Sequence, residues 1–124
     1  MNTWSYLLPL VGLFTSFSSL ADDGRQQILN QLKTLQQQGF DKAEKYQLSD
    51  MNQFKQCVNE SKNYRAMAKE LKETIMASND VIFRVPAYQA ADLAFQCVYC
   101  SDGAINYCQK MEKYIVKVEK ELEK

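Results

Sequence analysis

Apolar side chains recur every three or four positions along most of the chain, which is the spacing of one face of an α-helix. The first series begins after the acidic pair at residues 22–23 and ends just before Gly39, a residue type that commonly follows the last turn of a helix. We therefore expect a first helix from about residue 22 to Gly39. Its apolar face comprises Ile28, Leu29, Leu32 and Leu35. The polar stretch DKAEKYQLS that follows predicts a loop or a short helical turn.

The longest series predicts a second helix, which begins after Ser49 or Asp50 as N-cap and ends at Ser78-Asn79-Asp80. The positions that keep the three-to-four spacing are Met51, Phe54, Val58, Ser61, Ala68, Leu71 and Ile75, and Cys57 lies beside this apolar stripe. A helix of about 28 residues would be roughly 42 Å long, which exceeds the usual width of so small a domain. We therefore expect this helix to kink or to project at one end.

The segment VIFRVPAY, residues 81–88, is rich in β-branched and aromatic residues. Pro86 disfavours helical geometry at Val85, and no other segment offers a strand for pairing. We expect an extended linker that leads into a third helix from about Pro86 to Cys100. A break at residues 101–103 then precedes a fourth helix. The apolar face of that helix comprises Ile105, Cys108, Met111, Ile115, Val118 and Leu122.

These patterns predict an all-α fold, a small bundle of about four helices in a single domain over residues 22–124. The spacing in the last helix also suits a two-stranded coiled coil. It covers barely two heptads, however, which favours packing within the same domain.

The first 21 residues contain no Asp, Glu, Lys or Arg and include an apolar stretch from residue 7 to residue 20. The stretch ends on Ser19-Leu20-Ala21, where small residues flank Leu20 as a signal peptidase requires. We interpret residues 1–21 as a cleaved signal peptide. The lack of Lys and Arg over residues 2–6 departs from the usual pattern, and the alternatives are an uncleaved anchor or a first core helix.

Four cysteines in an exported chain indicate an oxidising compartment, secreted or periplasmic, and two disulfides. Cys97 and Cys108 lie at equal distances from the predicted break, so two antiparallel helices would place them face to face. We therefore favour a bond between Cys97 and Cys108 and another between Cys57 and Cys100. The next choice joins Cys57 to Cys97 and Cys100 to Cys108.

Cys97 and Cys100 also have the C-x-x-C spacing of a thiol-disulfide oxidoreductase, which needs its reactive cysteine at a helix N-terminus. The preceding residues, AADLAFQ, look helical and place Cys97 near a helix end, which argues against this chemistry. The chain contains no histidine, which argues against a zinc site and c-type haem and excludes every catalytic pair built on histidine. We expect no catalytic residue, no metal and no cofactor.

Lys and Arg number 15 against 15 Asp and Glu, and the two signs are scattered along the chain. A protein that binds nucleic acid would concentrate positive charge in a stripe, so we expect no nucleic-acid partner. The carboxylates lie among lysines on polar helix faces, which indicates solvated surfaces rather than a catalytic acid–base pair. Once the signal segment is removed, we also expect no stable membrane span.

These exclusions favour a non-enzymatic exported protein that binds another protein as an inhibitor, an immunity-type antagonist or an adaptor. The candidate contact residues are Ile82, Phe83, Arg84 and Tyr88, because aromatic residues and arginine are common anchors at interfaces. The alternative for this segment is a linker packed across the bundle, with Arg84 reaching solvent. Two other functions stay open: an oxidoreductase that uses Cys97 and Cys100, and a carrier of a small apolar ligand between the helices.

Overall fold

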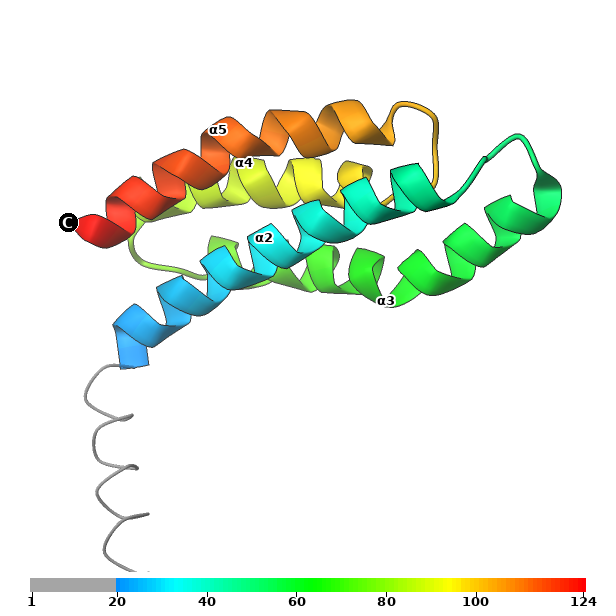
Figure 1. Cartoon of the computed structure of the whole chain (residues 1–124). Helices are drawn as coiled ribbons and strands as arrows, with labels where there is room; N and C mark the ends of the chain where they lie inside the picture. The colour runs from blue at the N-terminus through cyan, green and yellow to red at the C-terminus, as the bar shows by residue number, and fades with distance from the viewer. Residues whose placement is uncertain (1–19) are drawn as a thin grey trace, which may run out of the picture.

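The computed structural model describes residues 20–124, which form four α-helices and no strand. The helices are α2 (Leu20–Lys45), α3 (Met51–Met76), α4 (Val81–Cys97) and α5 (Ala104–Glu123). Successive helices run in opposite directions and are joined by short connections (Figure 1). The predicted all-α bundle is confirmed. The signal peptide expected over residues 1–21 lies, apart from its last two residues, outside the described part of the chain.

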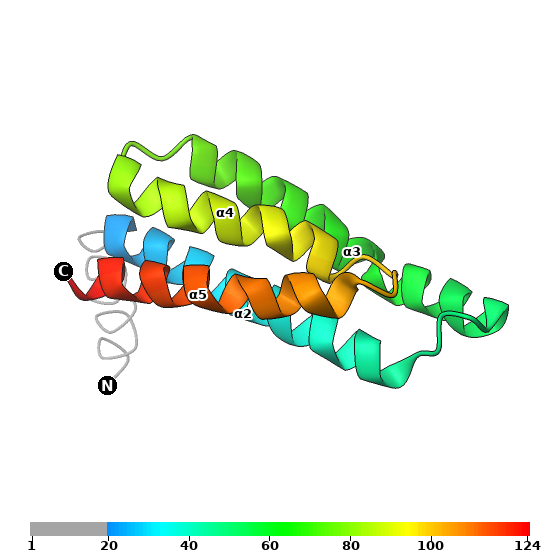
Figure 2. The same cartoon turned by 90° about the horizontal axis from the view of Figure 1, so that it is seen from above.

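α2 and α4 contact each other across the middle of the bundle, and each of them also contacts α3 and α5. α3 and α5 therefore occupy opposite corners. The connection between α2 and α3 extends beyond the loop between α4 and α5 at the same end of the molecule (Figure 2). The long helix α3, with 26 residues, thus projects at its N-terminal end.

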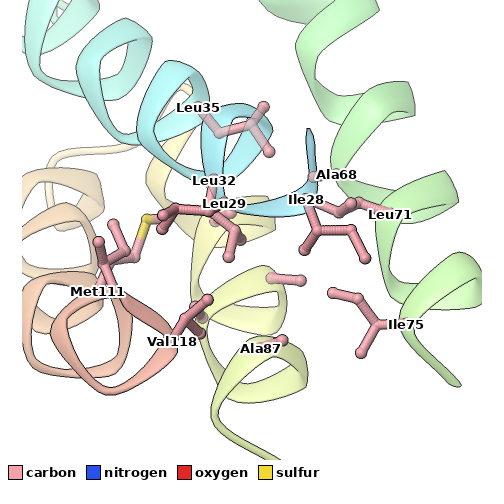
Figure 3. Packing of buried hydrophobic residues seen from close by; sticks show 14 of the residues in the cluster. Ile28, Leu29, Leu32, Leu35, Ala68, Leu71, Ile75, Ala87, Met111 and Val118 are labelled. Atoms are coloured by element: carbon pink, nitrogen blue, oxygen red, sulfur yellow. The ribbon is translucent and has the colours of Figure 1, made fainter. Parts of the chain in front are cut away.

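The core is formed by one apolar face from each helix (Figure 3). α4 contributes mainly small side chains, and the other three helices contribute larger ones that fill the space around them. Because alanine has only a methyl group, the neighbouring helices can approach α4 closely. Most of the apolar face of α5 is buried here, within the same bundle, although Ile105 is 37% exposed. The fully buried residues include Ala87, Ala90, Ala91 and Ala94 on α4 and Leu32, Leu35, Ile75, Met111 and Val118 on the other helices.

Gly39 does not end the first helix, contrary to the prediction, because α2 continues through it to Lys45. Its backbone φ is not positive, so the glycine is not needed for a left-handed turn. A Cβ at this position would lie 2.7 Å from the carbonyl oxygen of Cys97 and closer still to the sulfurs of Cys97 and Cys108. The glycine is required because α2 passes directly against this disulfide.

The segment VIFRVPAY forms about two turns at the start of α4, whereas we predicted an extended linker. Asp80 begins the helix as its N-cap: the carboxylate accepts a hydrogen bond from the Phe83 amide at 3.2 Å and is held by Arg25 of α2 at 3.1 Å. A proline inside a helix costs about 3 kcal/mol. Complete burial of Phe83 offsets this cost, and α4 therefore continues through Pro86 and ends at Cys97.

Candidate functional site

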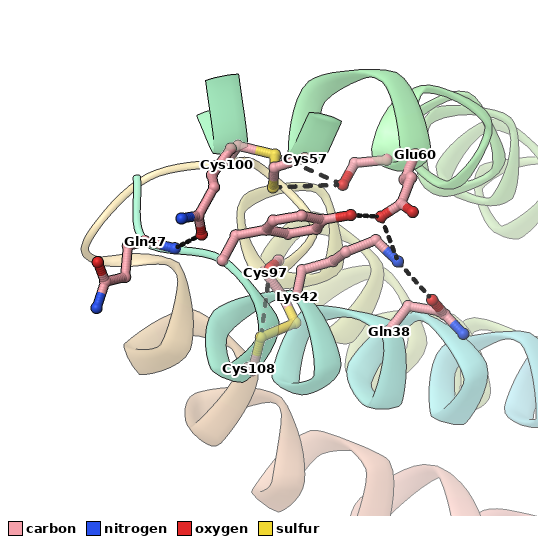
Figure 4. Close-up of a disulfide and its surroundings, with 11 residues drawn as sticks. Gln38, Lys42, Gln47, Cys57, Glu60, Cys97, Cys100 and Cys108 are labelled. Atoms are coloured by element: carbon pink, nitrogen blue, oxygen red, sulfur yellow. Dashed lines mark hydrogen bonds and ion pairs between the residues drawn. A yellow bond between two sulfur atoms is a disulfide. The ribbon is translucent and has the colours of Figure 1, made fainter. Parts of the chain in front are cut away.

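Two disulfides hold together the end of the bundle where α4 turns into α5 (Figure 4). Cys57 on α3 is bonded to Cys100, with their Cα atoms 6.1 Å apart, and Cys97 on α4 is bonded to Cys108 on α5, with a Cα–Cα distance of 4.6 Å. This is the first of the two connectivities considered above. The hydroxyl of Ser61 lies 3.5 Å from the Cys100 sulfur and, because a disulfide carries no proton, is the donor in this contact.

The sulfur atoms are poorly arranged for redox catalysis. Cys97 and Cys100 are bonded to different partners, and the two residues are only 1% and 9% exposed. The hollow beside them has a volume of about 20 Å³, which is room for about one water molecule. An oxidoreductase of the C-x-x-C type needs an accessible sulfur that an incoming thiolate can attack. This geometry favours a structural role for both bonds.

A polar cluster lies beside the Cys57–Cys100 disulfide, at the connection from α2 to α3. The hydroxyl of Tyr46 donates a hydrogen bond to Glu60, whose carboxylate also accepts a bond from Lys45 at 3.2 Å. The bond from Tyr46, followed by that from Lys45, lowers the pKa of Glu60, and the same Tyr46–Glu60 bond raises the pKa of Tyr46. The phenol therefore stays protonated and the carboxylate ionised at neutral pH. This cluster ties the connection to α3 and contains no activated nucleophile.

The described part of the chain offers few groups for metal chemistry. Over residues 20–124, no cluster of three or more His, Cys, Asp or Glu side chains is placed to hold a metal ion.

None of the helices α2 to α5 combines the length and the apolar character that crossing a membrane requires.

The four residues predicted to contact a partner point in different directions, because they lie on a helix. Phe83 is completely buried in the core. Arg84 turns toward the connection between α3 and α4 and donates a hydrogen bond to the carbonyl of Ser78 at 3.2 Å. Tyr88 is half-buried. Ile82, in contrast, is 67% exposed.

Ile82 lies in a surface hollow of about 510 Å³ between the first turns of α4 and the last turns of α5. We call this hollow the α4–α5 groove. Three of the seven large apolar side chains that are exposed over the described residues line it: Val81 (56%), Ile82 and Val85 (54%). The complete lining is Val81, Ile82, Val85, Pro86 and Gln89 from α4 and Lys117, Lys120, Glu121 and Lys124 from the end of the chain.

The polar side of the α4–α5 groove is positively charged. Its single acidic side chain, Glu121, pairs with Lys124 at 2.9 Å. Over residues 20–124, no carboxylate lies within ion-pair distance of Lys117 or Lys120, and Lys117 lies 5.5 Å from the centre of the Tyr114 ring. The groove therefore combines exposed apolar surface with positive charge that no acidic side chain of the bundle pairs with.

Sequence reasoning identified Ile82 but missed the rest of the groove. In a helix that begins at Asp80, Val81 and Val85 lie one turn apart on the same face, next to Ile82. Recognising Asp80 as the N-cap of α4 would have predicted this face, but the sequence analysis places Asp80 at the end of the preceding helix. The lysines of α5 resembled an ordinary solvated helix face, and only the packing of α5 against α4 reveals that they border apolar residues.

Comparisons with known protein families, with curated proteins and with solved structures found no match for this chain.

Proposed function

We propose that this protein is exported and acts without catalysis, by binding another protein through the α4–α5 groove. The observation that supports the proposal is the exposure of Val81, Ile82 and Val85 together in one hollow, beside Lys117 and Lys120, which have no carboxylate within ion-pair distance over residues 20–124. Large apolar side chains that gather in one place on a surface are typical of contact sites. An inhibitor, an immunity-type antagonist and an adaptor each work by covering a surface of their partner, and this groove suits any of these roles.

The apolar surface of the groove supplies part of the binding free energy that such a function requires. Burying a Val or Ile side chain completely contributes about 1.5–3 kcal/mol, and these three side chains are already covered to roughly one third (Ile82) or a little under one half (Val81 and Val85). Covering them would contribute on the order of 3 kcal/mol, whereas micromolar affinity requires about 8 kcal/mol in total. The groove would therefore be the centre of a larger interface.

The disulfides support a location outside the reducing cytosol, in a secreted or periplasmic compartment, because such bonds persist under oxidising conditions. The oxidoreductase alternative receives less support, because the sulfurs are buried and Cys97 and Cys100 are bonded to different partners. The alternative of an apolar-ligand carrier calls for a cavity between the helices, whereas the α4–α5 groove opens on the surface.

Site-specific photocrosslinking tests the proposal. A benzophenone amino acid replaces Ile82 in the test protein and Met51 in the control, because Met51 is almost equally exposed, at 65%, and begins α3 at the opposite end of the bundle (Figure 1). The proteins are produced in cells that export them and are irradiated there. We expect a protein adduct from position 82 that is absent from position 51. If the two positions give the same adducts, or none, the proposed function is wrong.

A further inference from the structure

The shape of the α4–α5 groove limits what it can bind. Its walls are two antiparallel helices that pack directly against each other, so the groove follows the helix axes. On α4, Val81, Val85 and Gln89 follow one another at four-residue intervals and extend over about 12 Å, or a little more than two helical turns. An open groove that runs along two helices can accept an amphipathic helix laid lengthwise, which is a common mode of recognition.

The charges limit the partner further. Lys117 and Lys120 are one turn apart on α5, both are exposed, and neither has a carboxylate within ion-pair distance over residues 20–124. Gln89 on the opposite wall is neutral. A segment that entered the groove with lysine or arginine side chains would bring like charges together, whereas one with aspartate or glutamate would find two unpaired cations.

We propose that the groove binds an acidic amphipathic helix of the partner protein. The apolar face of that helix covers Val81, Ile82 and Val85, and its carboxylates, spaced by three or four residues, pair with Lys117 and Lys120. This inference rests on the proposed function and names the kind of segment that the same site takes.

Two other occupants agree less well with these observations. A second copy of this chain that met groove to groove would bring two positively charged surfaces together. An anionic membrane would satisfy the lysines, but a helix that binds a membrane surface inserts a large apolar face, whereas only Val81, Ile82 and Val85 are exposed here. The partner helix satisfies both the shape and the charge.

Charge reversal at the groove tests the inference on the full exported chain. The variant Lys117→Glu/Lys120→Glu carries the crosslinker at position 82, and its control is Lys62→Glu/Lys69→Glu, which makes the same charge change on exposed lysines of α3, at the opposite corner of the bundle. We expect the adduct yield to fall about five- to ten-fold in the groove variant and to stay unchanged in the control. Peptide mapping of the adduct should identify a segment with acidic residues and helical apolar spacing. The variant Lys117→Gln/Lys120→Gln removes the two charges without reversing them and should lower the adduct yield by a smaller factor. It replaces the charge-reversal variant if that variant does not fold.

The outcomes separate the two proposals. If position 82 gives no specific adduct in the parent protein, the proposed function fails, and this inference fails with it. If the adduct forms but its yield does not respond to the lysines, or the mapped segment is neutral or basic, only the inference is overturned. Flotation with vesicles of equal parts phosphatidylglycerol and phosphatidylcholine tests the membrane. Binding that Lys117→Glu/Lys120→Glu abolishes would show that the groove faces lipid and would also overturn the inference.

Discussion

Gly39 of α2 and Cys97 of α4 are in direct contact, and the space that a side chain on Gly39 would need is occupied by the backbone and sulfur of Cys97. A Cβ there would lie 2.7 Å from the Cys97 carbonyl oxygen, a distance that real Cβ atoms essentially never show. A glycine within a helix costs up to about 1 kcal/mol relative to alanine. At this position the close packing of α2 against the disulfide offsets that cost.

Gly39→Ala should therefore destabilise the protein, although alanine is the better helix former. The added methyl group must push apart a backbone carbonyl and a disulfide, neither of which can rotate away, and overpacking of this kind costs about 1–3 kcal/mol. Urea unfolding without reductant measures the change. The control is Gly24→Ala, on the same helix with nothing within 4 Å of the new Cβ, which should raise stability by about 0.4–1 kcal/mol. Equal effects of the two variants would contradict the contact.

The same contact predicts that Gly39→Ala and loss of the disulfide are not additive. In a Cys97→Ala/Cys108→Ala background the sulfurs are gone and only the Cys97 carbonyl still opposes the new methyl group. We expect Gly39→Ala to cost at least about 1 kcal/mol less in this background than in the parent chain, as found for residues that share a contact. Four urea curves complete the cycle. Additive costs would mean that the backbone carbonyl, and not the sulfurs, sets the penalty.

The capping role of Asp80 can be separated from its ion pair with Arg25. Asp80→Ala removes both the hydrogen bond to the Phe83 amide and the ion pair, and should cost about 0.5–2 kcal/mol. Asp80→Asn keeps a side-chain oxygen for the cap and should retain most of the stability, because exposed ion pairs contribute little. Thermal unfolding of the two variants gives the comparison. If Asp80→Asn were as damaging as Asp80→Ala, the ion pair and not the cap would hold the start of α4.

Phe83 and Ile82, which sequence reasoning grouped together, should behave in opposite ways. Phe83→Ala empties a fully buried site and should lower the free energy of unfolding by about 3–5 kcal/mol. Ile82→Asp changes an exposed residue in the first turn of α4, where a negative charge suits the helix dipole, and should alter stability by less than about 0.5 kcal/mol. It should nevertheless abolish partner binding. Denaturant unfolding measures the stability of Phe83→Ala and of Ile82→Asp. A large loss of stability in Ile82→Asp would show that Ile82 is part of the core.

The helices and the disulfide pairing could be predicted because both depend on local spacing: the three-to-four period, and the symmetry of Cys97 and Cys108 about one turn. The continuation of α2 through Gly39 and of α4 through Pro86 could not be predicted. A glycine serves equally for a left-handed turn and for a close contact, and only the packing of α2 on the disulfide decides between them. At Pro86, the Asp80 cap and the burial of Phe83 outweigh the local preference of proline. The α4–α5 groove could not be predicted either, because residues 81–89 and 117–124 meet only through antiparallel packing.

Tyr46→Phe should destabilise the protein most at intermediate pH. In the folded state the pKa of Glu60 is lowered from 4.5, chiefly by the Tyr46 hydrogen bond, so this contribution is present above about pH 4.5 and is lost as the pH falls through the lowered value. The pKa of Tyr46 is raised from 10.0 by the same bond, so its contribution is present below pH 10 and is lost as the pH rises through the raised value. The pKa of the neighbouring Lys45 is raised from 10.5, first by its hydrogen bond to Tyr46 and then by that to Glu60, so this cation stays charged between these limits.

The difference in unfolding free energy between the parent and Tyr46→Phe should therefore be largest between about pH 4.5 and pH 10 and should shrink on both sides. Urea unfolding across this range measures it. The control is Tyr107→Phe. The Tyr107 hydroxyl bonds to no carboxylate within residues 20–124, and the centre of the Tyr107 ring lies 5.5 Å from the Lys110 amine. The change in unfolding free energy caused by Tyr107→Phe should stay constant as the pH falls through the lowered pKa of Glu60. A difference for Tyr46→Phe that is equally flat would show that the Tyr46–Glu60 bond does not contribute to stability.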